Sequence, residues 1–424
     1  MPRNVAVEII ETVLDRKRTL DIAEKDVARF ADLSSRDRAL CIGIVKTTLR
    51  HLGEIDALID AYLEKPLGKK SGSIRHIIRS GLAQFLFMGI PEHAAVSETV
   101  DLCVGSGGMP YKKLVNAILR RATREGRALL QTLDAAKINT PPWLWERWVT
   151  NYGEPTARAI ATTHMDEPPL DLAIKNDAPL WAEKLSGQFL PTGAVRIRPK
   201  GLINEIEGFA EGAWWIQDTA AQLPVRLLGN VSELDVIDLC AAPGGKTMEL
   251  AALGARVTAV DRSEKRLERV KQNLERTGLF AKTIAGDAAT WRPDHLADMV
   301  LLDAPCSSSG TIRRHPDIAY TKSANDIASL AIVQQRLLEA SIEMVKPGGL
   351  IVYCTCSLEP EEGEMQISEL LKNNSKVVEM PVTKVEAGGF TELLNENGQL
   401  RTLPCHMAEI GGMDGFFAAR LRKI

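Results

Sequence analysis

The chain lacks several features that mark other classes of protein. Its seven cysteines are irregularly spaced and no two are separated by two residues, so a zinc site has little support. The longest apolar stretch, residues 81–90, is far too short to cross a bilayer. No basic-then-apolar signal pattern opens the sequence. We therefore expect no metal, no membrane, and a reducing, cytoplasmic setting with free thiols.

A strong net charge is also absent, because the formal charge is only -3 over 424 residues. The composition, 45% hydrophobic and 25% charged, is that of a soluble globular protein, and the length predicts two or three domains. The charge is unevenly spread, however: residues 61–130 contain 11 Lys and Arg against 5 Asp and Glu. Such a basic stretch is typical either of a polyanion-binding surface or of a solvated helix face.

Residues 1–130 are predicted to be helical, because their apolar residues recur at helical spacing. Ser34, with Asp37 three residues later, predicts a helix start. In the last helix, from Tyr111 to about Arg127, one face is apolar and the opposite face is basic. The basic face consists of Lys113, Arg120, Arg124 and Arg127. It could contact phosphates or could simply be solvated.

Pro141-Pro142 marks a boundary, since two prolines cannot continue a helix. Residues 170–175 and 194–198 then alternate like strands, which predicts a small α/β connector. We expect Trp214, Trp215 and Ile216 to lie in its core.

From about Glu233 strands and helices alternate, which predicts a doubly wound parallel sheet. The expected strands are 236–242, 256–261, 281–287, 297–303, 349–354 and 415–421, and the expected helices are 246–253, 263–277 and 329–345. Ligands of such sheets lie outside the carboxyl ends of the strands.

A glycine-rich turn follows the first of these strands, in the sequence DLCAAPGGKT at 238–247. It matches neither the phosphate-binding G-x-x-x-x-G-K-[ST] loop nor G-x-G-x-x-G, so a triphosphate or dinucleotide is disfavoured. Asp261, Asp287 and Asp303 each end a following strand, where carboxylates could hold ribose hydroxyls and an adenine amino group. The set suits S-adenosyl-L-methionine, although a generic α/β ligand site would look similar.

Two strand ends carry reactive groups: Asp303 with Cys306 at one, and Cys356 at the other. The pattern therefore places a carboxylate and two thiols on one rim of the sheet, although a cysteine is often only a small buried hydrophobe. Arg313, Arg314 and Lys246 could hold phosphate or could be surface charges. We expect His315 to stabilise its loop.

Together these motifs resemble a known enzyme family. The matching segments are DLCAAPGGKT at 238–247, DAPCSSSGT at 303–311, RHPD at 314–317, TCS at 355–357 and DGFF at 414–417. Residues 236–424 resemble the RNA cytosine-C5 methyltransferases of the Fmu/Sun type. The N-terminal segments SRDRAL at 35–40, LAQFL at 82–86, PEHAAVSETV at 91–100 and LVNAILRR at 114–121 resemble the RNA-binding NusB-like fold.

The resemblance implies a Rossmann-like methyltransferase domain at 229–424, a connector at 141–228 and a NusB-like helical domain at 1–140. It implies transfer of a methyl group from S-adenosyl-L-methionine to carbon 5 of a cytosine in small-subunit (16S) rRNA. We separately expect the chain to be a monomer. A tRNA cytosine methyltransferase and a non-catalytic RNA-binding antitermination or assembly factor are the alternatives.

The resemblance also assigns the site residues. Cys356 is the nucleophile that adds to carbon 6 of cytosine, and Cys306 assists its release. Asp303 hydrogen-bonds the base edge, in protonated form where it donates to N3. The cofactor set is Cys240, Ala241, Ala242, Pro243, Gly244, Gly245, Lys246, Asp261, Asp287 and Asp303. Cys354 departs from the family, which more often has a small residue there, and leaves two thiols two positions apart.

Overall fold

The computed structural model describes residues 1–68, 71–105, 108–199 and 201–424, which form two compact units. Unit 1 comprises Met1–Glu167 together with Ile312–Ser323, and unit 2 comprises Pro168–Thr311 together with Ala324–Ile424. The division differs from the boundaries expected at 140 and 228. The helices that follow Pro142 pack into the helical unit, because Trp148 and Ala161 bury their side chains there.

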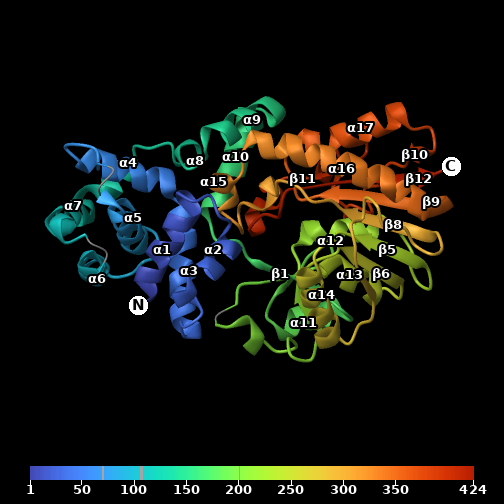
Figure 1. Ribbon diagram of the computed structural model, residues 1–424, viewed down its shortest axis with the longest axis horizontal. Coiled ribbons are helices and arrows are strands. Elements are labelled where there is room, and N and C mark those ends of the chain that lie inside the picture. Colours follow the sequence, from blue (N-terminus) through green and yellow to red (C-terminus); the bar gives the residue numbers. More distant parts are fainter. Residues whose placement is uncertain (69–70, 106–107, 200) are drawn as a thin grey trace. The chain divides into compact units, whose positions relative to one another are not determined.

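Unit 1 is helical throughout its described residues (Figure 1). Its α-helices are α1 (Pro2–Leu14), α2 (Leu20–Asp26), α3 (Ser35–Arg50), α4 (Leu52–Tyr62), α5 (Ile74–Leu86), α6 (Glu92–Gly105), α7 (Lys112–Leu130), α8 (Ala135–Ile138), α9 (Pro142–Tyr152), α10 (Glu154–Met165) and α15 (Ile318–Thr321). The predicted start of α3 is confirmed, since the Ser34 hydroxyl accepts a hydrogen bond from the Asp37 amide at 3.2 Å. The amphipathic pattern of α7 is also confirmed: Val115, Ile118 and Leu119 are buried.

The segment Ile312–Ser323, which carries the RHPD motif, is part of unit 1 although its neighbours in sequence belong to unit 2. The Asp317 carboxylate accepts a hydrogen bond from the Leu20 amide at 2.9 Å, and Arg50 donates to the Arg313 carbonyl at 3.0 Å. The Tyr320 hydroxyl donates to the Leu49 carbonyl at 2.9 Å. These bonds are buried or partly buried, so the segment is held as a structural component of the helical unit.

Unit 2 begins with a small antiparallel sheet of strand order β2-β3-β1-β4. Its elements are β1 (Leu170–Ile174), α11 (Ala178–Lys184), β2 (Gln188–Phe189), β3 (Val195–Ile197) and β4 (Trp214–Ile216), followed by α12 (Thr219–Arg226). The connector strands are confirmed, and Trp214 and Trp215 are buried as expected. The prediction for Ile216 is wrong: its side chain is 41% exposed at the last position of β4, although the two-residue period of a strand would place it on the same face as buried Trp214.

The main sheet has the strand order β10-β12-β9-β8-β5-β6-β7, and β11 pairs with β12. Its strands are β5 (Asp235–Leu239), β6 (Arg256–Asp261), β7 (Lys282–Ala285), β8 (Ala297–Asp303), β9 (Val345–Thr355), β10 (Val377–Glu379), β11 (Leu400–Thr402) and β12 (Phe416–Lys423). Strands β9, β8, β5, β6 and β7 are parallel, and the pairings of β12 are antiparallel. The predicted doubly wound sheet is confirmed.

Helices cover both faces of this sheet (Figure 1). They are α13 (Gly245–Ala252), α14 (Glu264–Thr277), α16 (Ala324–Met344) and α17 (Glu364–Asn373). Because the sheet is covered on both faces, its central strands are apolar without alternation, and Val300, Leu301 and Leu302 of β8 are all 0% exposed. Full burial of each such side chain contributes about 1.5–3 kcal/mol to the free energy of folding, so the central strands contribute strongly to the stability of the sheet.

Candidate active site

The carboxyl ends of β5, β6, β8 and β9 meet at one edge of the main sheet, since these strands are parallel neighbours. Asp261 is the last residue of β6 and Asp303 the last of β8. Asp303 pairs in register with Cys354 of β9, so the loops that begin after β8 and β9 leave the sheet side by side. The expected rim is therefore present.

Cys306 and Cys356 lie on these two loops with their Sγ atoms 3.4 Å apart. Both side chains are half-buried. The hydrogen bond from the Cys306 thiol lowers the pKa of Cys356, and the same contact, with burial, raises the pKa of Cys306 well above its ordinary value. The pair therefore favours a thiolate on Cys356 and a neutral thiol on Cys306.

An ion pair stands beside the thiols. The Lys246 ammonium lies 2.8 Å from Oδ2 of Asp303 and 4.8 Å from the centre of the Phe416 ring. Burial by itself would lower the pKa of Lys246, but the Asp303 carboxylate and the neighbouring thiols raise it, so the side chain stays an ammonium. Lys246 thus holds a positive charge next to Asp303 rather than gripping a phosphate.

Cys354 is not a second candidate nucleophile. Its side chain is 0% exposed within β9, and its Sγ lies 3.6 Å from Oδ1 of Asp303. Burial, followed by the negative charge of Asp303, raises the pKa of this thiol well above its ordinary value. A neutral, inaccessible thiol packs as a small hydrophobe, so the two positions have different tasks.

A cavity of about 260 Å³ opens at the same rim. The predicted cofactor residues Cys240, Asp261 and Asp287 line it, and so does Pro305, which precedes Cys306. Further lining residues escaped sequence analysis: Arg262, Arg266, Ala288, Ala289, Val333, Arg336 and Leu337. Those from α16 show the spacing of a single helix face, but nothing in their types marks them as binding residues.

Asp261 is held in place rather than free. One oxygen of its carboxylate accepts from the Ala242 amide at 3.2 Å, and the other from the Ser263 amide at 2.9 Å. The guanidinium of Arg266 lies 3.4 Å from Oδ2 and also donates to the Ala242 carbonyl. The two backbone amides therefore fix the orientation of the Asp261 carboxylate, which suits it to accept hydrogen bonds from the hydroxyl groups of a ligand.

Other members of the predicted cofactor set shape the glycine-rich turn. Gly244 has φ 102°, and a Cβ there would lie 3.1 Å from Val270, so only glycine fits. Gly245 then opens α13. Behind the turn, the Thr247 hydroxyl donates to buried Asp238 at 2.5 Å, and burial raises the pKa of Asp238 to about 7. Ala241, Ala242 and Pro243 complete the turn between β5 and α13.

The donor set fits S-adenosyl-L-methionine. The cavity offers the Asp261 and Asp287 carboxylates for hydroxyl and amino groups and apolar walls from Val333 and Leu337, and it is lined also by Pro305, the residue before Cys306. Among the described residues no cluster of His, Cys, Asp or Glu has the arrangement of a metal site. No described helix is long and apolar enough to span a bilayer.

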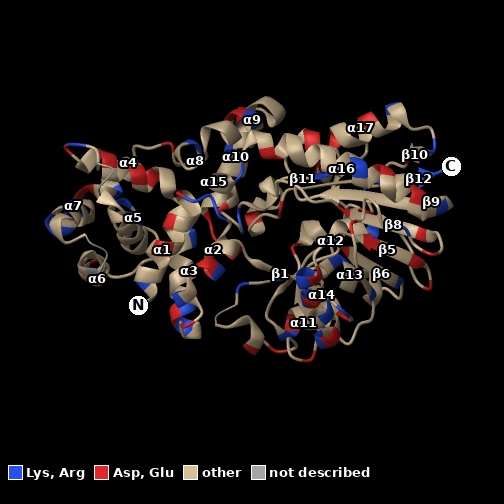
Figure 2. Cartoon of the chain, viewed as in Figure 1, with Lys and Arg blue, Asp and Glu red and all other residues tan. Residues whose placement is uncertain are grey.

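The predicted RNA-binding residues fall into two groups. Lys113, Arg120, Arg124 and Arg127 are exposed on α7, where Figure 2 marks basic positions in blue. Arg313, in contrast, is 0% exposed inside unit 1, so it cannot reach a phosphate and its assignment as an RNA contact is wrong. Arg314 is half-buried. The sequence around Arg313 is polar and gives no local sign that this side chain is buried.

Comparison with known proteins agrees with this geometry. Residues 225–422 match the family model described as 16S rRNA methyltransferase RsmB/F, and residues 1–124 match the NusB family. A ribosomal RNA small subunit methyltransferase B of Pasteurella multocida is 34% identical over 445 residues, covering 100% of this chain and 96% of that protein. The protein of the same name from Pseudomonas syringae pv. tomato is 36% identical, covering 100% and 97%.

Solved structures share the fold. PH0851 superimposes with a TM-score of 0.75 at 22% identity, covering 100% of this chain and 99% of its own. NSun6 from Pyrococcus horikoshii, solved with the S-adenosyl-L-methionine analogue SFG, gives 0.56 at 20% identity, covering 67% and 98%. S-adenosyl-L-methionine is the cofactor of the methyltransferase family that residues 225–422 match. With relatives above 30% identity along its whole length, the chain belongs to the RsmB/F family of S-adenosyl-L-methionine-dependent rRNA methyltransferases.

Proposed function

We propose that this chain methylates carbon 5 of a cytosine in small-subunit (16S) rRNA through a transient covalent bond between Cys356 and carbon 6 of the ring. One observation carries the proposal: the thiol of Cys356 lies 3.4 Å from that of Cys306, on the rim where Asp303 pairs with Lys246. Relatives named for small-subunit rRNA, and the NusB match at residues 1–124, support this substrate.

The thiol pair suits covalent catalysis because carbon 5 of cytosine is a weak nucleophile. Addition of the Cys356 thiolate to carbon 6 pushes an electron pair towards carbon 5, which can then accept a methyl group. Bound S-adenosyl-L-methionine supplies that methyl group in electrophilic form. As a carboxylate paired with Lys246, Asp303 accepts a hydrogen bond from the amino group of the base. In protonated form it donates to N3 and stabilises the charge that develops as carbon 6 is attacked.

Release reverses the addition. A base removes the proton from carbon 5, the bond between carbon 6 and Sγ breaks, and Cys356 departs as a thiolate. The neutral Cys306 thiol, 3.4 Å away, stabilises this leaving group by donating a hydrogen bond. A stacked cytosine cannot reach the rim, so the target base must be flipped out or lie in a loop.

The alternatives receive less support. The match of residues 1–124 to the NusB family gives no support to a tRNA substrate. A non-catalytic RNA-binding factor would not require a polarised thiol pair beside a cofactor cavity. The working form that we propose is a cytoplasmic monomer.

The test is methyl transfer from radiolabelled S-adenosyl-L-methionine to small-subunit rRNA isolated from a strain lacking the gene, followed by bisulfite mapping. We expect one methylated cytosine. Cys356→Ala should abolish turnover while cofactor affinity stays within about twofold, because the thiol acts only on the base. The half-buried Cys405 provides a matched control, and Cys405→Ala should remain active. Label in tRNA instead of rRNA would contradict the proposal.

A further inference from the structure

Each catalytic cysteine is followed by a buried serine. Ser307 follows Cys306 and is 1% exposed, and Ser357 follows Cys356 and is 0% exposed. The two serine hydroxyls lie 3.3 Å apart. The two loops are thus in contact through buried hydroxyls, each one residue from a reacting cysteine.

The carboxylate of Glu362 accepts hydrogen bonds from both serines. Its Oε1 accepts from the Ser307 amide at 2.9 Å and from Nε2 of Gln334 at 3.0 Å. Its Oε2 accepts from the Ser307 hydroxyl at 2.5 Å and from the Ser357 hydroxyl at 2.6 Å. Glu362 is 0% exposed, so these four donors replace water around a buried carboxylate.

The same turn, Pro360–Glu362, is tied to the sheet and to α16. The Glu362 carbonyl accepts from the Tyr353 hydroxyl at 2.8 Å and from the Thr355 hydroxyl at 3.1 Å, both on β9. Gln334 of α16 donates also to the Pro305 carbonyl at 2.9 Å. Bonds to β9 and to α16 therefore hold Glu362 in place, and its carboxylate bonds both cysteine loops from this fixed position.

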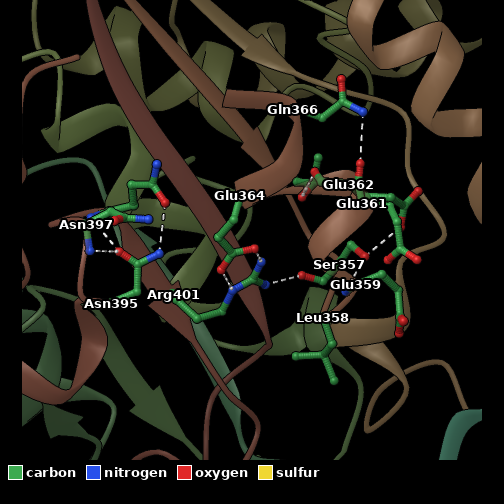
Figure 3. A network of polar contacts seen from close by, with 12 residues as sticks. Ser357, Leu358, Glu359, Glu361, Glu362, Glu364, Gln366, Asn395, Asn397 and Arg401 are labelled. Carbon is green, nitrogen blue, oxygen red and sulfur yellow. Dashed lines mark hydrogen bonds and ion pairs between the residues drawn. The ribbon is translucent and has the colours of Figure 1, made fainter. Parts of the chain in front are cut away.

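A second network supports the loop that carries Cys356. The Glu364 carboxylate pairs with the Arg401 guanidinium at 2.7 Å, and Arg401 also donates to the Ser357 carbonyl (Figure 3). This network fixes only one of the two loops. The two loops are also bonded directly, by the Gly310 amide to the Cys356 carbonyl at 3.1 Å and by the Leu358 amide to the Ser309 hydroxyl at 2.9 Å. Glu362 adds a buried carboxylate that accepts from the serine next to each cysteine.

We propose that Glu362 is a positioning residue that holds the Cys306 and Cys356 loops together and so sets the separation of the two thiols. This inference rests on the proposed function, which gives the thiols their roles. Glu362 touches neither sulfur. It acts through Ser307 and Ser357, each adjacent to one cysteine in the chain.

A carboxylate is required because all four of its partners donate. An amide at this position would turn an NH₂ group towards two of them. The Ser307 backbone amide cannot become an acceptor, and the Gln334 side chain could accept only by flipping and losing its bond to the Pro305 carbonyl. The serine hydroxyls would have to rotate and lose their present bonds. Displacement of one loop by about 1 Å is enough to break a sulfur–sulfur hydrogen bond, and misplacement on that scale costs about 100-fold in rate.

The experiment compares Glu362→Gln with Glu369→Gln, which makes the same chemical change at an exposed site on α17. One readout is the rate of Cys356 alkylation by iodoacetamide against pH, followed by peptide mass spectrometry without RNA or cofactor. In Glu362→Gln the midpoint should move to higher pH, because the hydrogen bond from Cys306 is weakened. With rRNA, kcat should fall about 10- to 100-fold while KM for RNA changes less than about threefold.

Unchanged alkylation and unchanged kcat in Glu362→Gln would overturn the positioning role. A shifted alkylation profile together with a wild-type protein that methylates no rRNA would instead overturn the proposed function and leave the positioning role standing. If Glu362→Gln does not fold, the same profile decides the matter in Ser307→Ala combined with Ser357→Ala. A profile unchanged there would overturn the inference, and a shift to higher pH would uphold it.

Discussion

Cys306 and Cys356 carry the same side chain, but their surroundings give them different chemistry. The contact of 3.4 Å between their sulfurs raises the pKa of one thiol and lowers that of the other. A thiolate can attack, whereas a neutral thiol can only donate. The asymmetry is a property of the pair, so removal of either member should affect a different half of the reaction.

Cys306→Ala is expected to stop the reaction after methyl transfer, because the departing Cys356 thiolate loses the donor that stabilises it. A covalent protein–RNA adduct should accumulate and survive as a shifted band on a denaturing gel. The band should disappear in Cys306→Ala combined with Cys356→Ala, which lacks the attacking sulfur. Normal turnover by Cys306→Ala, with no band, would remove the release role.

For single residues, the sequence predicts functional side chains that stand at strand ends, but it does not reveal those whose role depends on how the loops fold. Cys356 and Asp303 stand where an apolar run stops, which is a local signal. Glu362 lies in an acidic run that resembles a solvated surface, and its burial follows from loops that meet only in the fold. Arg313 was misjudged for the same reason.

Among the elements, α7 is the surface that we propose for RNA. Its apolar stripe packs inward, and its basic stripe stays in solvent. Three of the basic side chains donate within the protein: Arg120 to Asn116 at 3.1 Å, Arg124 to the Arg120 carbonyl at 2.9 Å, and Arg127 to the Phe85 carbonyl at 3.4 Å. The first two bonds are exposed and lie within α7, whereas that of Arg127 is partly buried against α5. Lys113, Arg120 and Arg124 are therefore better placed than Arg127 to turn towards phosphate.

Replacement of Lys113, Arg120 and Arg124 by Gln should weaken rRNA binding and lower the slope of log affinity against log salt by about 2, since each lost phosphate contact removes about 0.7. The measurement is a salt titration by filter binding or fluorescence anisotropy. The matched control removes three exposed positive charges from α14, at Lys265, Arg269 and Lys271. An equal loss of slope in both triple variants would reduce the α7 effect to net charge.

Element boundaries were predicted well where one pattern repeats along the chain. Strands β6 and β8 match their expected ranges, and α14 begins after the expected cap, Ser263. Strands β10 and β11 were missed, because each has only three residues and exists through pairing with β12. The backbones of Gly310 and Gly415 lie close together, since a Cβ on Gly310 would lie 2.0 Å from the Gly415 carbonyl oxygen, and this contact joins the DAPCSSSGT and DGFF segments.

At the scale of the whole molecule, the division into two units depends on a segment that lies far along the chain from the residues it contacts. Ile312–Ser323 leaves the methyltransferase sequence and becomes part of the helical unit. Local patterns cannot predict such a return, because its contacts join residues separated by hundreds of positions, as in the bond between Leu20 and Asp317. The fold of each unit was predictable from periodicity and motifs, whereas the assignment of this segment was not.

The returning segment creates an acid-sensitive site in unit 1. His164 is 8% exposed, its ring centre lies 5.4 Å from that of Trp148, and its Nε2 has no hydrogen-bond partner among the described residues. Burial, and then the positive charges of Arg313 and Arg50, lower the pKa of His164 to about 3. In the unfolded chain the ordinary value of about 6.5 applies, so between these pH values the unfolded state binds one more proton.

The His164 contribution to stability is therefore fully present above about pH 6.5 and declines as the pH falls towards 3, by about 1.4 kcal/mol per pH unit. His164→Phe keeps a ring in place and removes the titration, so its free energy of unfolding should depend less steeply on pH by that amount. Hydrogen exchange of the α10 amides in graded urea, between pH 4 and 7, measures the difference for unit 1. His93→Phe, at an exposed site on α6, should instead parallel the wild type. Parallel curves for His164→Phe and wild type would mean that His164 takes up its proton over the same pH range in the folded unit as in the unfolded chain, which would contradict its lowered pKa.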